Sequence, residues 1–215
     1  MISASQSLFA NIEIITIPAG PFLMGEQLQQ VELPEFRIAK YPVTNIEYHH
    51  FVEATGYRRP DHWPRVGSYP SELARHPVVF VSWVDAIAYT EWLGARLPSE
   101  TEWEKAARGT EGWIYPWGNK FIVENCNTSE SGTDGTRPVD ARAEGASAYG
   151  VVDMAGNVWE WTNTNYERDE QWRVLKGGAW DYKGLKDTRC AFHVYFRPIF
   201  RSNAVGFRCC WDSSK

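Results

Sequence analysis

The sequence has few cysteines and no long uninterrupted apolar run. Its four cysteines, Cys126, Cys190, Cys209 and Cys210, are too sparse for a disulfide scaffold and form no CxxC pair of the kind that binds zinc. No stretch of about 18 apolar residues occurs, and the first twenty residues lack the basic start and continuous apolar centre of an export signal. The sequence therefore predicts neither a membrane span nor export, and a cytoplasmic location is the default expectation.

Basic residues are also scarce. Lys and Arg number 22 against 27 Asp and Glu, which gives a formal net charge of -5 at pH 7. Because this composition forces no basic surface, we expect no nucleic-acid partner. Aromatic residues, by contrast, make up 14% of the 215 residues and include 11 tryptophans. Such side chains supply rigid contact area for a core, for an exposed binding surface, or for both.

Three segments show the signals of short helices. They follow Thr44, Ser82 and Ser99, residue types that cap helices well, and apolar residues then recur at roughly helical spacing. Acidic residues three positions after Ser82 and Ser99 complete capping boxes. Strands are predicted at 12–17 and 21–25, joined by a turn as a hairpin, and at 36–39.

The second half of the chain differs in composition. From residue 112 to residue 208 it is rich in Gly, Asn, Ser, Pro and Trp and has no sustained helical period. We therefore expect long structured loops and short strands there, and loops of this kind often carry function. No internal repeat or low-complexity linker interrupts the sequence, which predicts a single domain over residues 1–215.

Motifs spread over nearly the whole chain occur in the order known from one family. They are Pro18–Gly25, Tyr41–Asn45, Arg96–Glu104, Tyr115–Gly118, Tyr149–Trp161, Arg173–Trp180 and Val205–Arg208. Together they resemble the formylglycine-generating-enzyme family. The resemblance implies an α+β, C-type lectin-like fold in which short helices pack on small twisted antiparallel sheets with extensive loops.

The cysteine pair of the oxidising members of this family is missing. In those members, two cysteines shortly after the Gly-Gly-x-Trp motif bind copper(I), whereas residues Asp181 to Asp187 contain none. Cys190 has apolar neighbours that suggest burial, and the adjacent Cys209 and Cys210 point in opposite directions on a strand. We therefore expect that the protein is not an enzyme. A relative of the formylglycine-type oxidoreductases remains the alternative.

The resemblance also implies a structural calcium ion at the Gly-Asn-x-Trp-Glu segment. There Asn157 and Glu160 could offer oxygen ligands, with backbone carbonyls completing the shell. The alternative is that Asn157 turns the chain and Glu160 pairs with a cation. No other cofactor is expected.

The segment between Arg189 and Arg208 keeps the family's landmarks but carries apolar residues where relatives have polar ones. It resembles the variable proteins of diversity-generating retroelements, whose C-terminal repeat is diversified at adenines of AAC or AAT codons. Such changes reach Phe, Tyr, Val, Ile, Ser, Ala, Asp, His and Asn, but never Lys, Glu, Gln, Met or Trp. The positions nominated in this region, 181–204, all fall within the reachable set: Asp181, Tyr182, His193, Val194, Tyr195, Phe196, Ile199, Phe200, Ser202, Asn203 and Ala204.

These residues predict a non-catalytic domain that binds a protein or another macromolecular ligand. Tyrosines and phenylalanines would serve as rigid anchors, with small and polar residues around them, as in antibody loops. A recognition or sensor module of a larger effector system is an alternative function. A structural alternative is that Val194, Phe196 and Phe200 fill a core strand. The sequence leaves the oligomeric state open.

Overall fold

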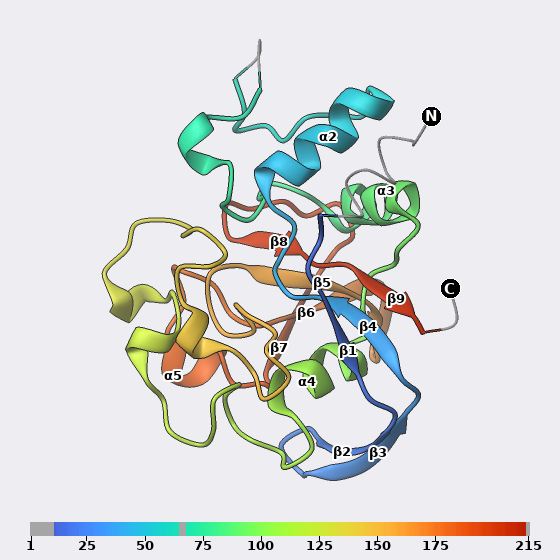
Figure 1. The fold of residues 1–215 in the computed structure, drawn as a ribbon, viewed down its shortest axis with the longest axis vertical. Coiled ribbons are helices and arrows are strands. Elements are labelled where there is room, and N and C mark those ends of the chain that lie inside the picture. Colours follow the sequence, from blue (N-terminus) through green and yellow to red (C-terminus); the bar gives the residue numbers. More distant parts are fainter. Residues whose placement is uncertain (1–10, 65–67, 214–215) are drawn as a thin grey trace.

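The computed structural model describes residues 11–64 and 68–213 and confirms the α+β, C-type lectin-like fold (Figure 1). The α-helices in these ranges are α2 (Asn45–Thr55), α3 (Trp83–Leu93), α4 (Glu100–Arg108) and α5 (Gly184–Asp187). The short 3-10 helices are η1 (Ser71–Leu73), η2 (Val123–Asn125), η3 (Ser129–Ser131) and η4 (Ala143–Gly145). None of the helices described is long and apolar enough to cross a bilayer.

The longer helices begin where the cap residues predict. Ser82 accepts a hydrogen bond from the Asp85 backbone, and the Asp85 side chain accepts one in return from the Ser82 backbone. The same reciprocal capping box starts α2 at Thr44 and α4 at Ser99. Each box satisfies two backbone donors that a helix start otherwise leaves without partners.

The strands at the N-terminus correct the predicted hairpin. β1 (Ile14–Ile17) and β2 (Gly20–Met24) are both strands, but they do not pair with each other. Instead, β1 pairs antiparallel with β4 (Phe36–Ala39), and β2 pairs with β3 (Gln29–Leu33). β4 also pairs with β9 (Cys210–Asp212), so the last strand closes a sheet begun at the start of the chain (Figure 1).

The central sheet carries the C-terminal half of the chain and has the strand order β7-β6-β5-β8. Its members are β5 (Trp159–Tyr166), β6 (Asp169–Lys176), β7 (His193–Phe196) and β8 (Val205–Phe207). β5, β6 and β7 run antiparallel, whereas β8 lies parallel to β5. Because β7 is at the edge of this sheet, one side of the strand faces no other strand of the sheet.

Many of the aromatic side chains fill the core. The larger buried cluster lies between the central sheet and helices α2 and α3, and it includes the fully buried Trp159 and Trp161. A smaller cluster lies beside α4 around Trp103. Large apolar side chains also stand exposed near the C-terminus, where Tyr195 is 41% and Ile199 is 71% exposed. The aromatic residues therefore serve both a core and a surface.

Candidate functional site

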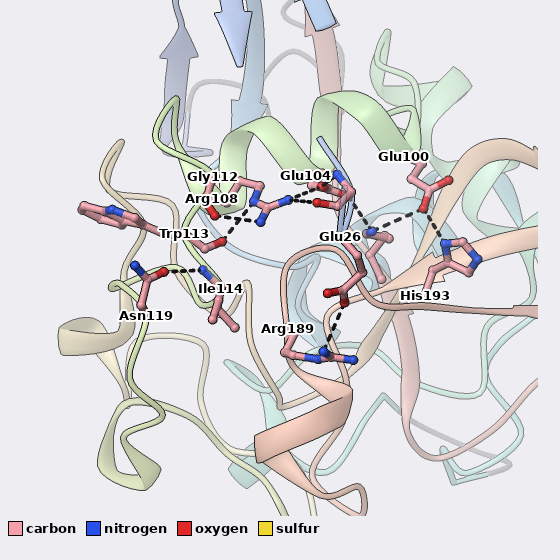
Figure 2. A network of polar contacts seen from close by, with 12 residues as sticks. Glu26, Glu100, Glu104, Arg108, Gly112, Trp113, Ile114, Asn119, Arg189 and His193 are labelled. Carbon is pink, nitrogen blue, oxygen red and sulfur yellow. Dashed lines mark hydrogen bonds and ion pairs between the residues drawn. The ribbon is translucent and has the colours of Figure 1, made fainter. Parts of the chain in front are cut away.

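A chain of charged side chains lies between α4 and the central sheet (Figure 2). Glu100, the first residue of α4, accepts a hydrogen bond of 2.7 Å from Nδ1 of His193, the first residue of β7. The same carboxylate lies 3.3 Å from Nζ of Lys176, whose other partner is Glu104 at 3.0 Å. Three elements far apart in sequence thus contribute to one network.

The inner part of this network is closed to solvent. The side chain of Lys176 is 0% exposed and that of Glu104 is 1% exposed. Glu104 also pairs with Arg108 at 2.8 Å and accepts the backbone N–H of Gly25. Every charge in this part of the network has an opposite partner, as the desolvation cost of buried ions requires.

The carboxylate of Glu100 is ionised in this setting. Burial alone would raise the pKa of Glu100, but the hydrogen bond from His193 and the charge of Lys176 outweigh it and hold the pKa below its usual range. The backbone N–H of Glu100 donates to Thr164 Oγ1 at 2.8 Å, which anchors the start of α4 to β5. The acid is therefore charged and held in one position.

A cavity of about 370 Å³ opens beside this acid. Glu100 and His193 lie in its wall together with Val174 of β6 and Tyr166 of β5. The remaining lining residues are Met24, Gly25, Glu26, Gln27, Glu104, Thr164, Asn165, Glu167 and Ala191. A volume of this size matches small-molecule sites in proteins.

Tyr166, in the cavity wall, also belongs to a group of contacting side chains that extends onto the surface. We call this group, Tyr166, Trp172, Tyr195 and Arg197, the tyrosine cluster. The rings of Tyr166 and Tyr195 stack with centroids 3.7 Å apart, and Trp172 meets Tyr195 edge-on at 5.8 Å. The Arg197 guanidinium lies 5.5 Å from the centroid of the Trp172 ring. The cluster holds its planar groups in fixed mutual orientations without removing Tyr195 from solvent.

Alternation along β7 divides the nominated residues between two sides of the sheet. His193 and Tyr195 face the cavity and the tyrosine cluster. Val194 and Phe196 point the other way, and Phe196 stacks on Phe200 with centroids 4.1 Å apart. Val194, Phe196 and Phe200 are half-buried and pack against the larger core cluster, as the structural alternative expects, but Phe200 lies outside the strand.

The other nominated positions lie in the loops around β7. Asp181, Tyr182, Ile199 and Asn203 are exposed, and Ser202 is half-buried and hydrogen-bonded to Asn203. Ala204 is a correction: it is only 2% exposed and belongs to the core cluster, because it precedes the buried strand β8. Ala204 therefore cannot contact a ligand at the surface.

The residues nominated for calcium do not fit that ion. Both oxygens of Glu160 accept hydrogen bonds of 2.7 Å from Arg208, and one also accepts from Trp103. The Asn157 oxygen accepts from the Asn127 side chain and the Arg137 backbone. With a guanidinium already filling the carboxylate, a second cation finds no free oxygen on these two side chains. The alternative of a turn at Asn157 and a cation partner for Glu160 describes the structure.

The cysteines occupy the core. All four are buried with free thiols, and burial raises the pKa of Cys190 to about 12. Cys209 packs in the larger core cluster and Cys210 in the smaller one, so the adjacent thiols do point apart. Within the part of the chain that the structure describes, no group of three or more His, Cys, Asp and Glu side chains could hold a metal ion.

Sequence reasoning missed the partners that give His193 its setting. Glu100 was not singled out from the sequence, and Tyr166 and Trp172 lay in a stretch expected to contain long loops and short strands. The aromatic and β-branched residues of Trp159–Tyr166 were the signal for the long strand β5, whose first four residues are all buried. Nothing local indicated that residues 93 positions apart would be hydrogen-bonded.

Comparison with known proteins identifies relatives along nearly the full length. Residues 3–213 match the FGE-sulfatase family, described as the sulfatase-modifying factor enzyme 1-like domain. The chain is 34% identical to the formylglycine-generating enzyme of Thermomonospora curvata, with 93% of each chain covered. It is 32% identical to the inactive C-alpha-formylglycine-generating enzyme 2 of Bos taurus, over 93% of this chain and 88% of the relative.

A structural neighbour shares the fold at lower sequence identity. The Treponema denticola variable protein 1 superposes with a TM-score of 0.78 at 20% identity, covering 93% of this chain and 94% of that chain. At this identity the likeness establishes the fold alone. The same backbone architecture therefore occurs both in formylglycine-generating enzymes and in a variable protein.

These relatives correct the expectation that the protein is not an enzyme. Besides formylglycine-generating enzymes, they include the hercynine oxygenase of Mycolicibacterium smegmatis at 31% identity, and such relatives point to an enzymatic protein. The cysteine pair that the family resemblance implies is absent from residues Asp181 to Asp187. From its match over almost the whole length, the chain belongs to the sulfatase-modifying factor enzyme 1-like family.

Proposed function

We propose that the protein binds a protein or another macromolecular ligand through its C-terminal surface, as a variable protein of a diversity-generating retroelement. The observation that carries the proposal is the exposure of large apolar anchors on and around the edge strand β7. Tyr182, Tyr195 and Ile199 are 36%, 41% and 71% exposed. Exposed apolar side chains gathered in one region are a feature of interaction sites.

The anchors are held rigidly, which favours binding. Tyr195 is fixed between Tyr166 and Trp172. A side chain that is already ordered loses little conformational entropy when it meets a ligand. In antibody loops, rigid aromatic side chains supply contact area and small polar residues supply hydrogen bonds; we assign the same two roles to the aromatic anchors and to Ser202 and Asn203.

The architecture supports variation at this surface. The C-terminal strands β8 and β9 join sheets begun earlier in the chain, so the surface is supported by a closed framework. We propose on this ground that residues 1–215 form one domain. The fold shared with a Treponema denticola variable protein is consistent with this use.

A binding selection tests the proposal. The immobilised chain selects ligands from a displayed library of folded domains, and each ligand is then measured against the double variant Tyr195→Ala, Ile199→Ser. We expect the Kd to rise about 10-fold or more, because central aromatic anchors dominate interfaces. The matched control is Leu185→Ser, since Leu185 is 64% exposed but lies outside the nominated set. Equal loss in both variants, or no selected ligand, would contradict the proposal.

A further inference from the structure

We propose that His193 and Glu100 form a general-base dyad serving the cavity between α4 and β7. His193 is the catalytic base, and Glu100 is the positioning residue. The substrate is a small molecule without negative charge that carries, or is attacked by, an O–H or N–H group. This inference goes beyond ligand binding at the surface and does not depend on it.

The hydrogen bond to Glu100 sets the protonation of the imidazole. Since the Glu100 carboxylate can only accept, Nδ1 of His193 carries the proton across the 2.7 Å contact. In the neutral form of this ring the second nitrogen, Nε2, is unprotonated and presents a lone pair. Nε2 points away from Glu100 (Figure 2), and the side chain is 39% exposed in the cavity wall. This is the arrangement that a carboxylate–histidine pair needs for general-base catalysis.

The Glu100 carboxylate also contacts a buried cation on the side away from solvent. Lys176, wholly buried, lies 3.3 Å from the Glu100 carboxylate and shares its charge with Glu104. The position of Glu100 in the first turn of α4 further stabilises negative charge through the helix dipole. When Nε2 takes up a proton, the imidazolium therefore forms an ion pair with a carboxylate that needs no rearrangement.

The charges around the cavity restrict the substrate. Four glutamates line it, and the described lining contains no Lys or Arg. The positive charges lie behind the wall, where Lys176 and Arg108 neutralise Glu104 and Glu100, while Arg189 pairs with Glu26 at 3.2 Å. An anion would face glutamate oxygens without a cation to meet it, so neutral or cationic molecules are favoured.

The chemistry balances for the smallest substrate pair, water and an uncharged ester. Water transfers a proton to Nε2 of His193 while its oxygen bonds to the acyl carbon. The bond from that carbon to the leaving oxygen breaks, and the electron pair departs with the alkoxide or phenolate. The imidazolium then returns its proton to the leaving group, which regenerates the neutral imidazole beside the ionised Glu100.

Hydrolysis of p-nitrophenyl acetate tests this step. His193→Gln should lower the rate about 100-fold, in the range that a general base contributes, and Glu100→Gln should lower it less, by about 10-fold. His50→Gln is the control, because His50 is exposed on α2 outside the cavity and should leave the rate unchanged. Circular dichroism verifies that each variant is folded. Equal rates for the wild type and His193→Gln would overturn the proposal, as would an equal loss in His50→Gln.

A second measurement separates positioning from mere support of the fold. Nitrogen-15 NMR of the wild type should show neutral His193 protonated on Nδ1, and Glu100→Gln should shift the proton towards Nε2, because an amide can donate to Nδ1. A wild-type ring protonated on Nε2 would overturn the dyad even if the protein binds ligands at its surface. Conversely, loss of surface binding in the Tyr195 variant leaves the tautomer and the hydrolysis rate unaffected.

Discussion

Two regions on the central sheet distribute polarity in opposite ways. Beside α4, buried charged side chains form ion pairs, as with Arg208 and Glu160, both 0% exposed. At β7 and the loop after it, apolar side chains such as Tyr195 and Ile199 stand in solvent. The first region orders the backbone by satisfying costly charges, and the second presents apolar area that folding does not require. A protein with this division can change its surface and keep its framework.

The largest effect is expected from breaking the buried pair. Arg208 donates to Glu160 and also to the backbone carbonyls of Ala39 and Val152, so it ties together separate segments of the chain. Arg208→Leu leaves the Glu160 carboxylate buried without its cation. We expect the free energy of unfolding to fall by about 3–5 kcal/mol in urea denaturation.

An exposed ion pair provides the matched control for that variant. The side chains of Arg75 and Asp140, 2.8 Å apart, are 58% and 48% exposed. Arg75→Leu should cost less than about 1 kcal/mol, because solvent screens the pair. If the two variants lost similar free energies of unfolding, burial would not be the reason why the Arg208–Glu160 pair stabilises the fold.

The second effect concerns pH and the buried Asp153. Burial raises the pKa of Asp153 to about 7, with the nearby Glu160 adding to it and the Asn157 hydrogen bond opposing it. Because the pKa of Asp153 is higher in the native state than in the unfolded state, the native state binds this proton more tightly. The stability that comes from this proton is present at pH 4 and is lost as pH rises through 7. From pH 5 to pH 8 the contribution of Asp153 to the free energy of unfolding should decrease by about 2–3 kcal/mol.

Asp153→Asn isolates this contribution, since asparagine does not titrate and can keep a hydrogen bond to Asn157. The variant should lose less stability than the wild type between pH 5 and pH 8, measured by urea denaturation at each pH. Taking the difference removes the opposite effect of His62 and His76, whose pKa values burial lowers. Parallel pH curves for the two proteins would contradict the assignment to Asp153.

The smallest expected changes in stability compare two neighbouring residues of the C-terminal surface, one half-buried and one exposed. Phe200 packs half-buried against the core, so Phe200→Ala should cost about 1–2 kcal/mol. Ile199, its neighbour, is 71% exposed, and Ile199→Ala should change stability by less than about 0.5 kcal/mol. Thermal denaturation compares the two. A large loss at Ile199 would mean that its exposure does not make it free for binding.

The sequence could predict what depends on neighbouring residues. Ser82 and Asp85 specify a helix start on their own, and the ordered motifs point to the fold through resemblance. The predicted hairpin was wrong because β1 finds its partner in β4, beyond another strand pair, and pairing at that distance has no local signal. Ala204 was misjudged for the same reason: its burial depends on packing between β8 and the rest of the core.

The site shows the same limit. His193, Tyr195 and Ile199 were nominated from the resemblance to variable proteins, and the structure leaves them accessible, but whether they bind a ligand stays a prediction. Which side of the sheet His193 and Tyr195 face depends on how β7 packs against β6, and the pairing of His193 with Glu100 needs the tertiary fold. The calcium prediction did not fit because the guanidinium of Arg208, 48 positions away, already occupies Glu160.

The most direct test of a fixed framework with a variable surface is the DNA around the segment encoding Asp181 to Arg208. We predict a nearby near-copy of this segment that differs at adenines, together with a reverse-transcriptase gene. The differences should fall on exposed positions such as Tyr195 and Ile199 and spare the buried Arg208. Absence of any such copy, or differences scattered over buried and exposed codons alike, would contradict the variable-protein function.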